Sequence, residues 1–317
     1  MSKVLVTGAN GFVGTRILEI LSLEHYETLA AVRQKESLTK FGDIEAFEVG
    51  SINASTDWSS CLKDVDVVVH VAARAHVMGE QGMDGLDIYR QVNLHGTLAL
   101  GHEALRQGVK RFIYISSIKA MGEKSSLDKP LSLEAEFHPE DAYGLSKLEA
   151  EMALKELTSN SSMELTIIRP PLVYGKGVKG NFASLTKLVL LGFPIPLGGI
   201  ENKRSLVAID NLVDLIKVCI NHPKAGNQTF LVSDDDDVST SKLLRELAYA
   251  QNVQLRLFHL PLFVLKTVAK MFNKRSMIDR LYGSLQVDIT ETKRRLGWQP
   301  KVSLREGLEN MFKEDIR

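Results

Sequence analysis

Cysteine is scarce in this chain of 317 residues, which contains only Cys61 and Cys219, far apart and outside any metal-ligand or redox spacing. The scarcity argues against a secreted disulfide scaffold, no metal site is predicted, and two reduced core thiols of a cytoplasmic protein are expected. Charge of one sign is not in excess either, because lysine plus arginine and aspartate plus glutamate both number 39. No global electric field therefore indicates nucleic acid as a partner.

Long apolar runs are also missing. No stretch approaches the ~20 apolar residues that a membrane span needs. The N-terminus leads directly into a strand pattern, so no signal peptide is expected. Hydrophobic residues make up 44% and charged residues 25% of the chain, which is typical of a water-soluble enzyme.

Strand patterns alternate with helical periodicity through the first half of the chain. Strands are predicted at 3–6, 28–32, 45–49, 66–72, 111–116 and 165–169, and long helices at 86–107 and 142–157. This alternation predicts an α/β fold, a Rossmann-type doubly wound parallel sheet covered by helices on both faces. After Tyr174 the rhythm is less regular and glycine and proline become dense. We therefore expect an NAD(P)-binding domain with the catalytic residues at 1–175, and a smaller α/β substrate lobe at 176–317, interleaved with the first.

A glycine-rich turn, VTGANGFVG, joins the first strand to the first helix. Glycine allows a tight turn and a close backbone approach, so that the helix N-terminus can face a pyrophosphate. The strand–turn–helix context makes a dinucleotide site a better interpretation than a merely flexible turn. The candidate cofactor contacts in this turn are Gly8, Gly11, Phe12, Val13 and Gly14.

The end of the second predicted strand bears on which dinucleotide is bound. An acidic residue there commonly binds the ribose 2′-hydroxyl of NAD, whereas arginine pairs with the 2′-phosphate of NADP. This chain has Arg33, followed by Gln34 and Lys35. NADP is therefore favoured as cofactor, NAD is not excluded, and the alternative is an arginine that stacks on adenine.

The stretch YGLSK places Tyr143 and Lys147 one helical turn apart, on the same face of a predicted helix. A tyrosine with its ordinary pKa of ~10 is a poor proton acceptor at neutral pH. A nearby ammonium group is expected to lower that pKa and so to make proton transfer efficient. Ser117, at the end of the strand predicted at 111–116, is placed to hydrogen-bond the same reacting oxygen.

These motifs resemble the extended short-chain dehydrogenase/reductase family, the NAD-dependent epimerases and dehydratases. The resemblance spans nearly the whole chain and includes HVAA, VNLHGT, SSIKAMG, RPPLVYG, RSLVAIDNL and LGWQP. It implies that Ser117, Tyr143 and Lys147 form the catalytic triad. It also implies that Tyr143, Lys147 and three further residues contact the cofactor, namely Ala72, Ala73 and Pro170, and that Asn93 braces the active-site helix. Ser51 and Ile52 stand where the family often has an acidic residue, which leaves the adenine contact open.

The resemblance further implies that the second lobe binds a nucleoside diphosphate, so the expected partner is a UDP-sugar. Arg204 matches the arginine that holds the diphosphate, as guanidinium geometry suits. Asn181 and Arg280 are the next candidates for substrate contacts, with a structural surface role as the alternative. Arg74 and His76 fall near the expected sugar, where an ordinary loop role is the simpler interpretation.

The apolar segment 260–272 contains few charges and is expected to form a helix. A place in the core or in a subunit interface, such as that of a homodimer, is the simpler reading. Contact with a membrane surface is the alternative.

The stretch ISSIKAMGE narrows the expected reaction. Dehydratases of the resembled family generally carry Asp and Glu directly after the hydroxyl residue, whereas this chain has Ile118 and Lys119. Dehydration is therefore not expected, and hydride and proton exchange at one carbinol carbon, C4, remains. The favoured activity is a 4-ketoreductase that forms UDP-N-acetyl-D-quinovosamine, or its C4 epimer UDP-N-acetyl-fucosamine, for O-antigen or lipopolysaccharide synthesis. The alternatives are a UDP-hexose 4-epimerase and, more remotely, a catalytically idle NADP-binding protein.

Overall fold

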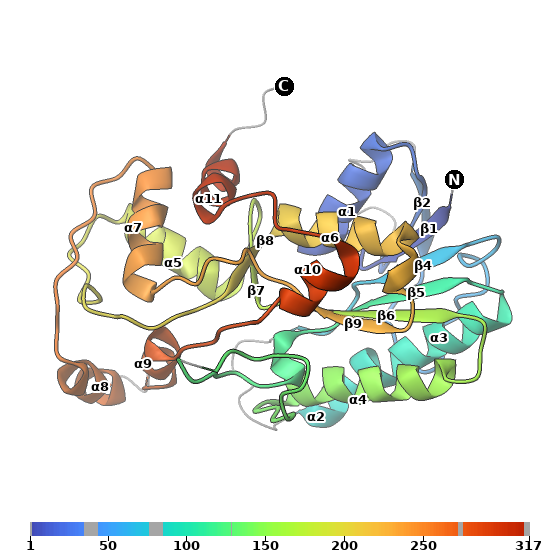
Figure 1. Cartoon of the computed structure of the whole chain (residues 1–317), viewed down its shortest axis with the longest axis horizontal. Coiled ribbons are helices and arrows are strands. Elements are labelled where there is room, and N and C mark those ends of the chain that lie inside the picture. The colour runs from blue at the N-terminus through green and yellow to red at the C-terminus, as the bar shows by residue number, and fades with distance from the viewer. Residues whose placement is uncertain (1, 35–43, 76–84, 128, 272–274, 314–317) are drawn as a thin grey trace.

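The computed structural model describes residues 2–34, 44–75, 85–127, 129–271 and 275–313, and Lys35 and His76 lie outside these ranges. Its centre is a seven-stranded parallel sheet with the order β3-β2-β1-β4-β5-β6-β9 (Figure 1). The strands are β1 (Lys3–Thr7), β2 (Glu27–Val32), β3 (Glu45–Glu48), β4 (Val67–His70), β5 (Arg111–Ile115), β6 (Glu164–Arg169) and β9 (Gln228–Leu231). The predicted Rossmann-type α/β fold is confirmed.

Helices cover both faces of this sheet because alternate side chains of each strand enter two different cores. Val4 and Val6 of β1 pack with α1 (Phe12–Leu23) and α6 (Ile209–Asn221), whereas Leu5 packs on the opposite side. That second face is covered by α3 (Thr97–Arg106) and α4 (Ala142–Thr158). Strands that are buried on both faces explain the nearly continuous apolar runs in the sequence.

The strand order reverses beside β1, and this reversal locates the ligand crevice. From β1 the chain continues outward to β2 and β3, and it then returns to β4, which pairs with the other edge of β1. In open parallel sheets, ligands bind at such a switch point, beyond the carboxyl ends of the strands. The glycine-rich turn follows β1 at this end of the sheet.

The helix predicted at 86–107 is interrupted. It consists of α2 (Leu86–Arg90), a π-helical segment (Gln91–Gly96) and α3. A π-helical segment inside an α-helix is frequently found at functional sites. Here it includes Asn93, which is almost fully buried.

The chain after Tyr174 contributes to two parts of the molecule. Strand β9, helix α6 and helix α10 (Thr290–Leu296) lie with the large sheet. The remaining elements form a smaller lobe with its own core around the parallel pair β7 (Leu172–Tyr174) and β8 (Leu206–Ala208) (Figure 1). Its helices are α5 (Gly180–Leu190), α7 (Thr240–Ala250), α8 (Leu262–Met271), α9 (Arg275–Tyr282) and α11 (Leu304–Phe312).

A buried carboxylate, Asp234, links the two parts. One of its oxygens accepts hydrogen bonds from the Ala208 amide at 2.8 Å and the Asn211 side chain at 2.7 Å, and the other accepts from the Tyr174 hydroxyl at 2.7 Å. Because these partners belong to β7, β8 and α6, one side chain fixes the small lobe to the sheet. None of the described helices is both long and apolar enough to span a membrane.

Candidate active site

The glycine-rich turn is held so tightly that side chains could not be accommodated. Gly8 has a φ of 63°, and a Cβ atom there would lie 2.8 Å from the backbone of Ala72. A Cβ atom at Gly14 would lie 2.2 Å from the Gly8 carbonyl oxygen. Gly11 is the N-cap of α1 and offers no side-chain acceptor to its first amides, and Phe12 and Val13 are the first helical residues. The first amides of α1 can donate hydrogen bonds to a bound pyrophosphate, as a dinucleotide site requires.

A buried histidine that the sequence analysis missed supports this turn. The Thr7 hydroxyl oxygen accepts hydrogen bonds from the amides of Val71 and Ala72, both at 3.2 Å, so its own proton is donated to His70 Nδ1 at 2.7 Å. His70 Nε2 then donates to the Thr97 hydroxyl at 2.9 Å. Burial lowers the pKa of His70 to about 3, so the ring is neutral. The available signal was one polar residue inside the apolar strand DVVVHVA.

The three expected catalytic residues come together at the carboxyl end of β5. Ser117 follows β5, and Tyr143 lies in the first turn of α4, one turn before Lys147. The Ser117 hydroxyl lies near enough to the Tyr143 hydroxyl to favour its ionised form. Lys147 is 1% exposed and donates to the Ile115 carbonyl at 2.7 Å, and its ammonium lies 4.3 Å from the centre of the Tyr114 ring. Residues far apart in the sequence thus form one polar cluster at the carboxyl end of β5.

The expected lowering of the Tyr143 pKa is wrong. Burial raises the pKa of Tyr143 to about 12, opposed by the hydrogen bond from Ser117 and increased by the charge of Asp141. The reason is the placement of Lys147, whose ammonium faces the Ile115 carbonyl and the Tyr114 ring. Burial in turn lowers the pKa of Lys147 to about 7, and the negative charge of Glu151 opposes this. The sequence spacing predicted that Tyr143 and Lys147 are neighbours, but desolvation dominates the pKa of both side chains.

A buried ion pair lies one turn beyond Lys147 on α4. The guanidinium of Arg169, at the end of β6, donates from Nε to Glu151 at 2.9 Å, and the two side chains are only 2% and 1% exposed. The next residue along the chain is Pro170, whose carbonyl accepts a hydrogen bond from the Ile118 amide at 2.9 Å. Pro170 is therefore fixed beside the turn that carries Ser117.

Lys119 stands where dehydratases of the resembled family generally carry an acid. In this chain it has a structural role. Its ammonium lies 2.6 Å from Asp141 and 2.7 Å from Glu123. Asp141 is the N-cap of α4 and accepts a hydrogen bond from the Gly144 amide at 2.7 Å. A Cβ atom at Gly144 would lie 2.4 Å from the Lys119 carbonyl oxygen, so the two segments are in direct contact. Lys119 thus ties the start of the Tyr143 helix to the turn after β5.

Asn93 braces α4 from its other side, as expected. Its side-chain amide donates to the Ser146 hydroxyl at 2.9 Å and to the Arg74 carbonyl at 3.1 Å, and its oxygen accepts from the Arg74 amide at 2.8 Å. The Arg74 guanidinium lies 5.5 Å from the centre of the Tyr89 ring. Asn93 therefore joins the π-helical segment, the loop after β4 and the catalytic helix.

The structure brings two of the three expected substrate residues together. Arg204 donates from Nη1 to the carbonyl oxygens of Arg280, at 2.7 Å, and Gly283, at 3.2 Å. Burial lowers the pKa of Arg204, the neighbouring charge of Arg280 lowers it further, and Glu123 opposes this. Asn181 lies exposed in the first turn of α5, and no contact between it and either arginine is recorded within the described residues. Arg33 is exposed directly after β2.

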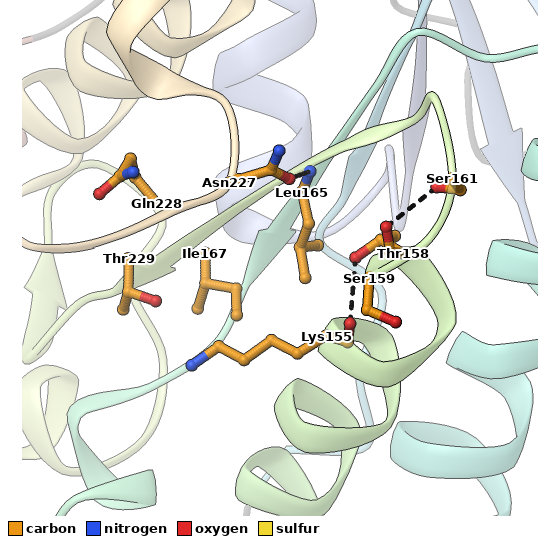
Figure 2. Close-up of a pocket in the computed structure, with 9 residues that line it drawn as sticks. All are labelled: Lys155, Thr158, Ser159, Ser161, Leu165, Ile167, Asn227, Gln228 and Thr229. Carbon is orange, nitrogen blue, oxygen red and sulfur yellow. Dashed lines mark hydrogen bonds between the residues drawn. The ribbon is translucent and has the colours of Figure 1, made fainter.

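A cavity of about 380 Å³ lies elsewhere, at the far end of α4 (Figure 2). It is lined by the last turn of α4, the following residues and the facing parts of β6 and β9, namely Lys155, Thr158, Ser159, Ser161, Leu165, Ile167, Asn227, Gln228 and Thr229. Ser117, Tyr143 and Lys147 do not line this cavity. The cavity is therefore separate from the catalytic cluster.

Because the folded-state pKa of Lys147 lies below its unfolded value of 10.5, the unfolded chain binds more protons between about pH 7 and that value. We predict that the unfolding free energy falls as pH decreases through this window. Lys147→Met should remove this loss, on the order of 2 kcal/mol between about pH 9 and pH 6.5. Denaturant unfolding at several pH values measures the difference. Lys155→Met, an exposed lysine on the same helix, is the control, and parallel curves for wild type and Lys147→Met would contradict the prediction.

Solved structures of similar fold include two sugar-nucleotide epimerases. The chain matches UDP-glucose 4-epimerase from Thermotoga maritima with UDP-glucose at a TM-score of 0.76 and 24% identity, covering 98% of this chain and 97% of that one. It matches UDP-glucuronic acid 4-epimerase from Bacillus cereus in complex with NAD at a TM-score of 0.79 and 22% identity, covering 97% and 94%. These identities support the likeness of fold alone.

Curated relatives correct the expected activity. The chain is 52% identical to a UDP-glucose 4-epimerase from Vibrio cholerae over 97% of its own length and 93% of the relative. It is 29% identical to an N-acetyl-alpha-D-glucosaminyl-diphospho-ditrans,octacis-undecaprenol 4-epimerase from Escherichia coli O157:H7, over 82% and 75%. The expectation of a 4-ketoreductase forming UDP-N-acetyl-D-quinovosamine is therefore wrong, and the similarity favours the epimerase alternative. The two activities use the same serine, tyrosine and lysine, so motifs alone did not separate them.

The family assignment rests on a match over most of the chain. Residues 4–233 match the model of the NAD dependent epimerase/dehydratase family. This range includes the glycine-rich turn, the catalytic cluster and Arg204. The chain belongs to the NAD dependent epimerase/dehydratase family.

Proposed function

We propose that this protein is a UDP-hexose 4-epimerase that interconverts UDP-glucose or UDP-N-acetylglucosamine with the C4 epimer and retains NAD during turnover. The observation that carries the proposal is the 52% identity to the Vibrio cholerae UDP-glucose 4-epimerase over nearly the whole chain. The site is compatible with this proposal, because Lys119 is paired with Asp141 and Glu123 and neither of the two residues directly after Ser117 is acidic. Such a site lacks the acid and base that dehydration needs.

In this proposal the side chains hold one oxygen and move one proton. Bound NAD would supply a reversible hydride acceptor for C4, with the hydride returning to the opposite face of the ketone, so that no cofactor would be consumed. Tyr143 removes the proton of the C4 hydroxyl and later returns it, and Ser117 hydrogen-bonds the same oxygen. Lys147 supplies positive charge one helical turn from Tyr143, and its pKa of about 7 makes that charge sensitive to pH. Gly8, Gly11, Gly14, Ala72, Ala73 and Pro170 would form the cofactor cleft.

The substrate diphosphate is assigned to the arginine pair of the small lobe. Arg204 is largely buried, with its backbone fixed by hydrogen bonds to Val238, and Arg280 lies beside it on α9. The charge of Arg280 contributes to the lowered pKa of Arg204, and two positive side chains near each other favour a dianionic ligand. Asn181 remains a candidate for the edge of this site.

The proposed reaction weakens the inference that Arg33 indicates NADP as the cofactor. An epimerase regenerates its cofactor in each turnover and so has no need of cellular NADPH. Arg33 lies exposed directly after β2, where a guanidinium can stack on adenine without contacting a 2′-phosphate. We therefore propose NAD as the resident cofactor.

A second candidate substrate is N-acetylglucosamine carried on a polyprenyl diphosphate. The relative from Escherichia coli O157:H7 acts on such a lipid-linked sugar according to its name. The favouring observation in this chain is an exposed apolar surface on the same lobe as Arg204 and Arg280. Both substrates share the sugar diphosphate, and both fit a cytoplasmic role in surface polysaccharide synthesis.

We predict that the purified protein converts UDP-glucose or UDP-N-acetylglucosamine into its C4 epimer without net change in the absorbance of reduced nicotinamide. Tyr143→Phe should lower kcat roughly 10²–10⁴-fold because the proton-transfer group is lost, while NAD stays bound. Product analysis by NMR and nucleotide release on denaturation measure both effects. Tyr249→Phe, an exposed tyrosine, is the control. Stoichiometric oxidation of added NADH, with no epimer formed, would refute the proposal.

Lys119→Met should lower kcat about tenfold or more with a smaller change in KM. Without the ammonium, the carboxylates of Asp141 and Glu123 are left unpaired in a partly buried site, and the start of α4 shifts relative to Ser117. Lys119→Arg should restore much of the activity. The neighbouring Lys124→Met, which breaks an exposed pair with Glu140, is the matched control. Equal effects of the two methionine variants would show that Lys119 has no positioning role.

Arg33→Ala should weaken NAD and NADP binding to a similar degree, because stacking on adenine does not depend on the 2′-phosphate. Fluorescence titration of cofactor-free protein with each dinucleotide measures the two affinities. A selective loss of NADP binding of about tenfold or more would instead show a charge-assisted contact to the 2′-phosphate. That result would restore NADP as the preferred cofactor.

A further inference from the structure

Large apolar side chains are concentrated at one end of the small lobe. Thirteen large hydrophobic residues are exposed in the described part of the chain, and six of them fall in two short segments. We name these six the apolar tip: Leu190, Leu191, Phe193, Phe258, Leu262 and Phe263, with exposed fractions between 36% and 72%. Such a concentration indicates an interaction surface rather than scattered surface residues.

The two segments of the apolar tip are joined by backbone hydrogen bonds. The Ile195 amide donates to the Arg256 carbonyl at 2.8 Å, the Phe258 amide to the Ile195 carbonyl at 3.1 Å, and the Gly198 amide to the Phe258 carbonyl at 3.0 Å. Figure 1 shows the loop after α5 in yellow and the loop after α7 in orange along the same edge of the lobe, with α8 below them. The tip is therefore one surface.

The exposed residues of the tip alternate with residues that are buried in the lobe. Ile195, Leu197 and Leu265 are at most 8% exposed and belong to the core around β7 and β8. The segments are thus anchored from beneath. Their outward apolar side chains are held in place on a packed support.

The charged residues within the two segments that form the tip have one sign. Residues 187–200 and 254–278 contain six lysines and arginines and no aspartate or glutamate. Lys266 pairs with Asp279 of α9 at 3.1 Å. Lys187, Arg256 and Lys270 are exposed and form no ion pair with any residue that the structure describes. In a chain with equal numbers of acidic and basic residues, this arrangement is a local positive field.

The sign of this charge selects among the surfaces that could cover the tip. In a two-fold contact with a second copy, the same basic patch would lie on both sides and no acidic side chain of the tip would be available to pair with it. An anionic bilayer offers apolar chains to the phenylalanines and leucines, and phosphate groups to the lysines and arginine. We propose that the apolar tip docks this protein peripherally onto the surface of membranes rich in anionic phospholipid.

Docking at the tip would also place the substrate lobe at the bilayer. Helix α8, which includes Leu262 and Phe263, packs on α9, which carries Arg280. If the proposed function holds, the diphosphate site therefore lies on the docked side of the lobe. Vesicle binding itself requires no turnover, so it tests the tip independently of the proposed reaction.

The test is co-sedimentation of the full chain with vesicles of phosphatidylcholine mixed with phosphatidylglycerol, compared with phosphatidylcholine alone. We expect binding to the anionic vesicles that weakens as salt is raised. Phe258→Ser combined with Phe263→Ser should lower the partition coefficient roughly tenfold or more. Leu23→Ser on α1 is the matched control, because Leu23 is 73% and Phe263 72% exposed. Lys270→Glu should weaken binding by roughly tenfold, whereas the exposed Lys63→Glu should not.

Three results would overturn the proposal. The first is no sedimentation of wild type with the anionic vesicles at low salt. The second is an equal loss of binding in the Leu23→Ser control. The third is a self-association that sedimentation velocity detects in wild type and that the double serine variant abolishes, with no vesicle binding in either protein, since a second copy would then cover the tip. Thermal unfolding of each variant checks that the exposed substitutions leave the fold intact.

Discussion

The burial of the Lys147 ammonium is the constraint on which the site depends. A cation removed from water is costly unless the surrounding groups compensate for it. Here the compensation comes from the Ile115 carbonyl, the face of the Tyr114 ring and the charge of Glu151. Glu151 is itself buried and is paired with Arg169. The candidate active site is therefore continuous with a row of buried charged side chains, Lys147, Glu151 and Arg169, between α4 and the sheet.

The N-terminal part of α4 must be held in place for the same reason. Asn93 braces its second turn through Ser146, and Lys119 binds its N-cap Asp141. A small shift of the helix would move the Tyr143 hydroxyl away from Ser117 and the Lys147 ammonium away from its carbonyl partner. An acid at position 119 would face Asp141 and Glu123 with a like charge. The lysine instead fixes the N-cap of α4 relative to the turn after β5.

Local patterns in the sequence predicted the fold well, and they identified three candidate catalytic residues that the structure brings together. The period of the strands gave the parallel sheet, and the four-residue spacing of Tyr143 and Lys147 gave their common face. What the sequence missed depends on distant contacts. One partner of Lys119, Asp141, is 22 residues away. His70 is explained only by two threonines on other elements. The pKa of Tyr143 is raised by burial in the folded core. The choice between ketoreductase and epimerase failed for a different reason, since the same residues serve both reactions.

The proposed epimerisation adds a requirement that this architecture can meet. The hydride must leave one face of C4 and return to the other, so the sugar has to turn while its diphosphate stays bound. The two ends of the substrate are assigned to different parts of the molecule: the C4 oxygen to α4 and β5, and the diphosphate to Arg204 and Arg280. Asp234 fixes these parts relative to each other. A fixed diphosphate and a small set of contacts at C4 allow the hexose to rotate between them. A site that hydrogen-bonded every hydroxyl would permit hydride transfer at only one face.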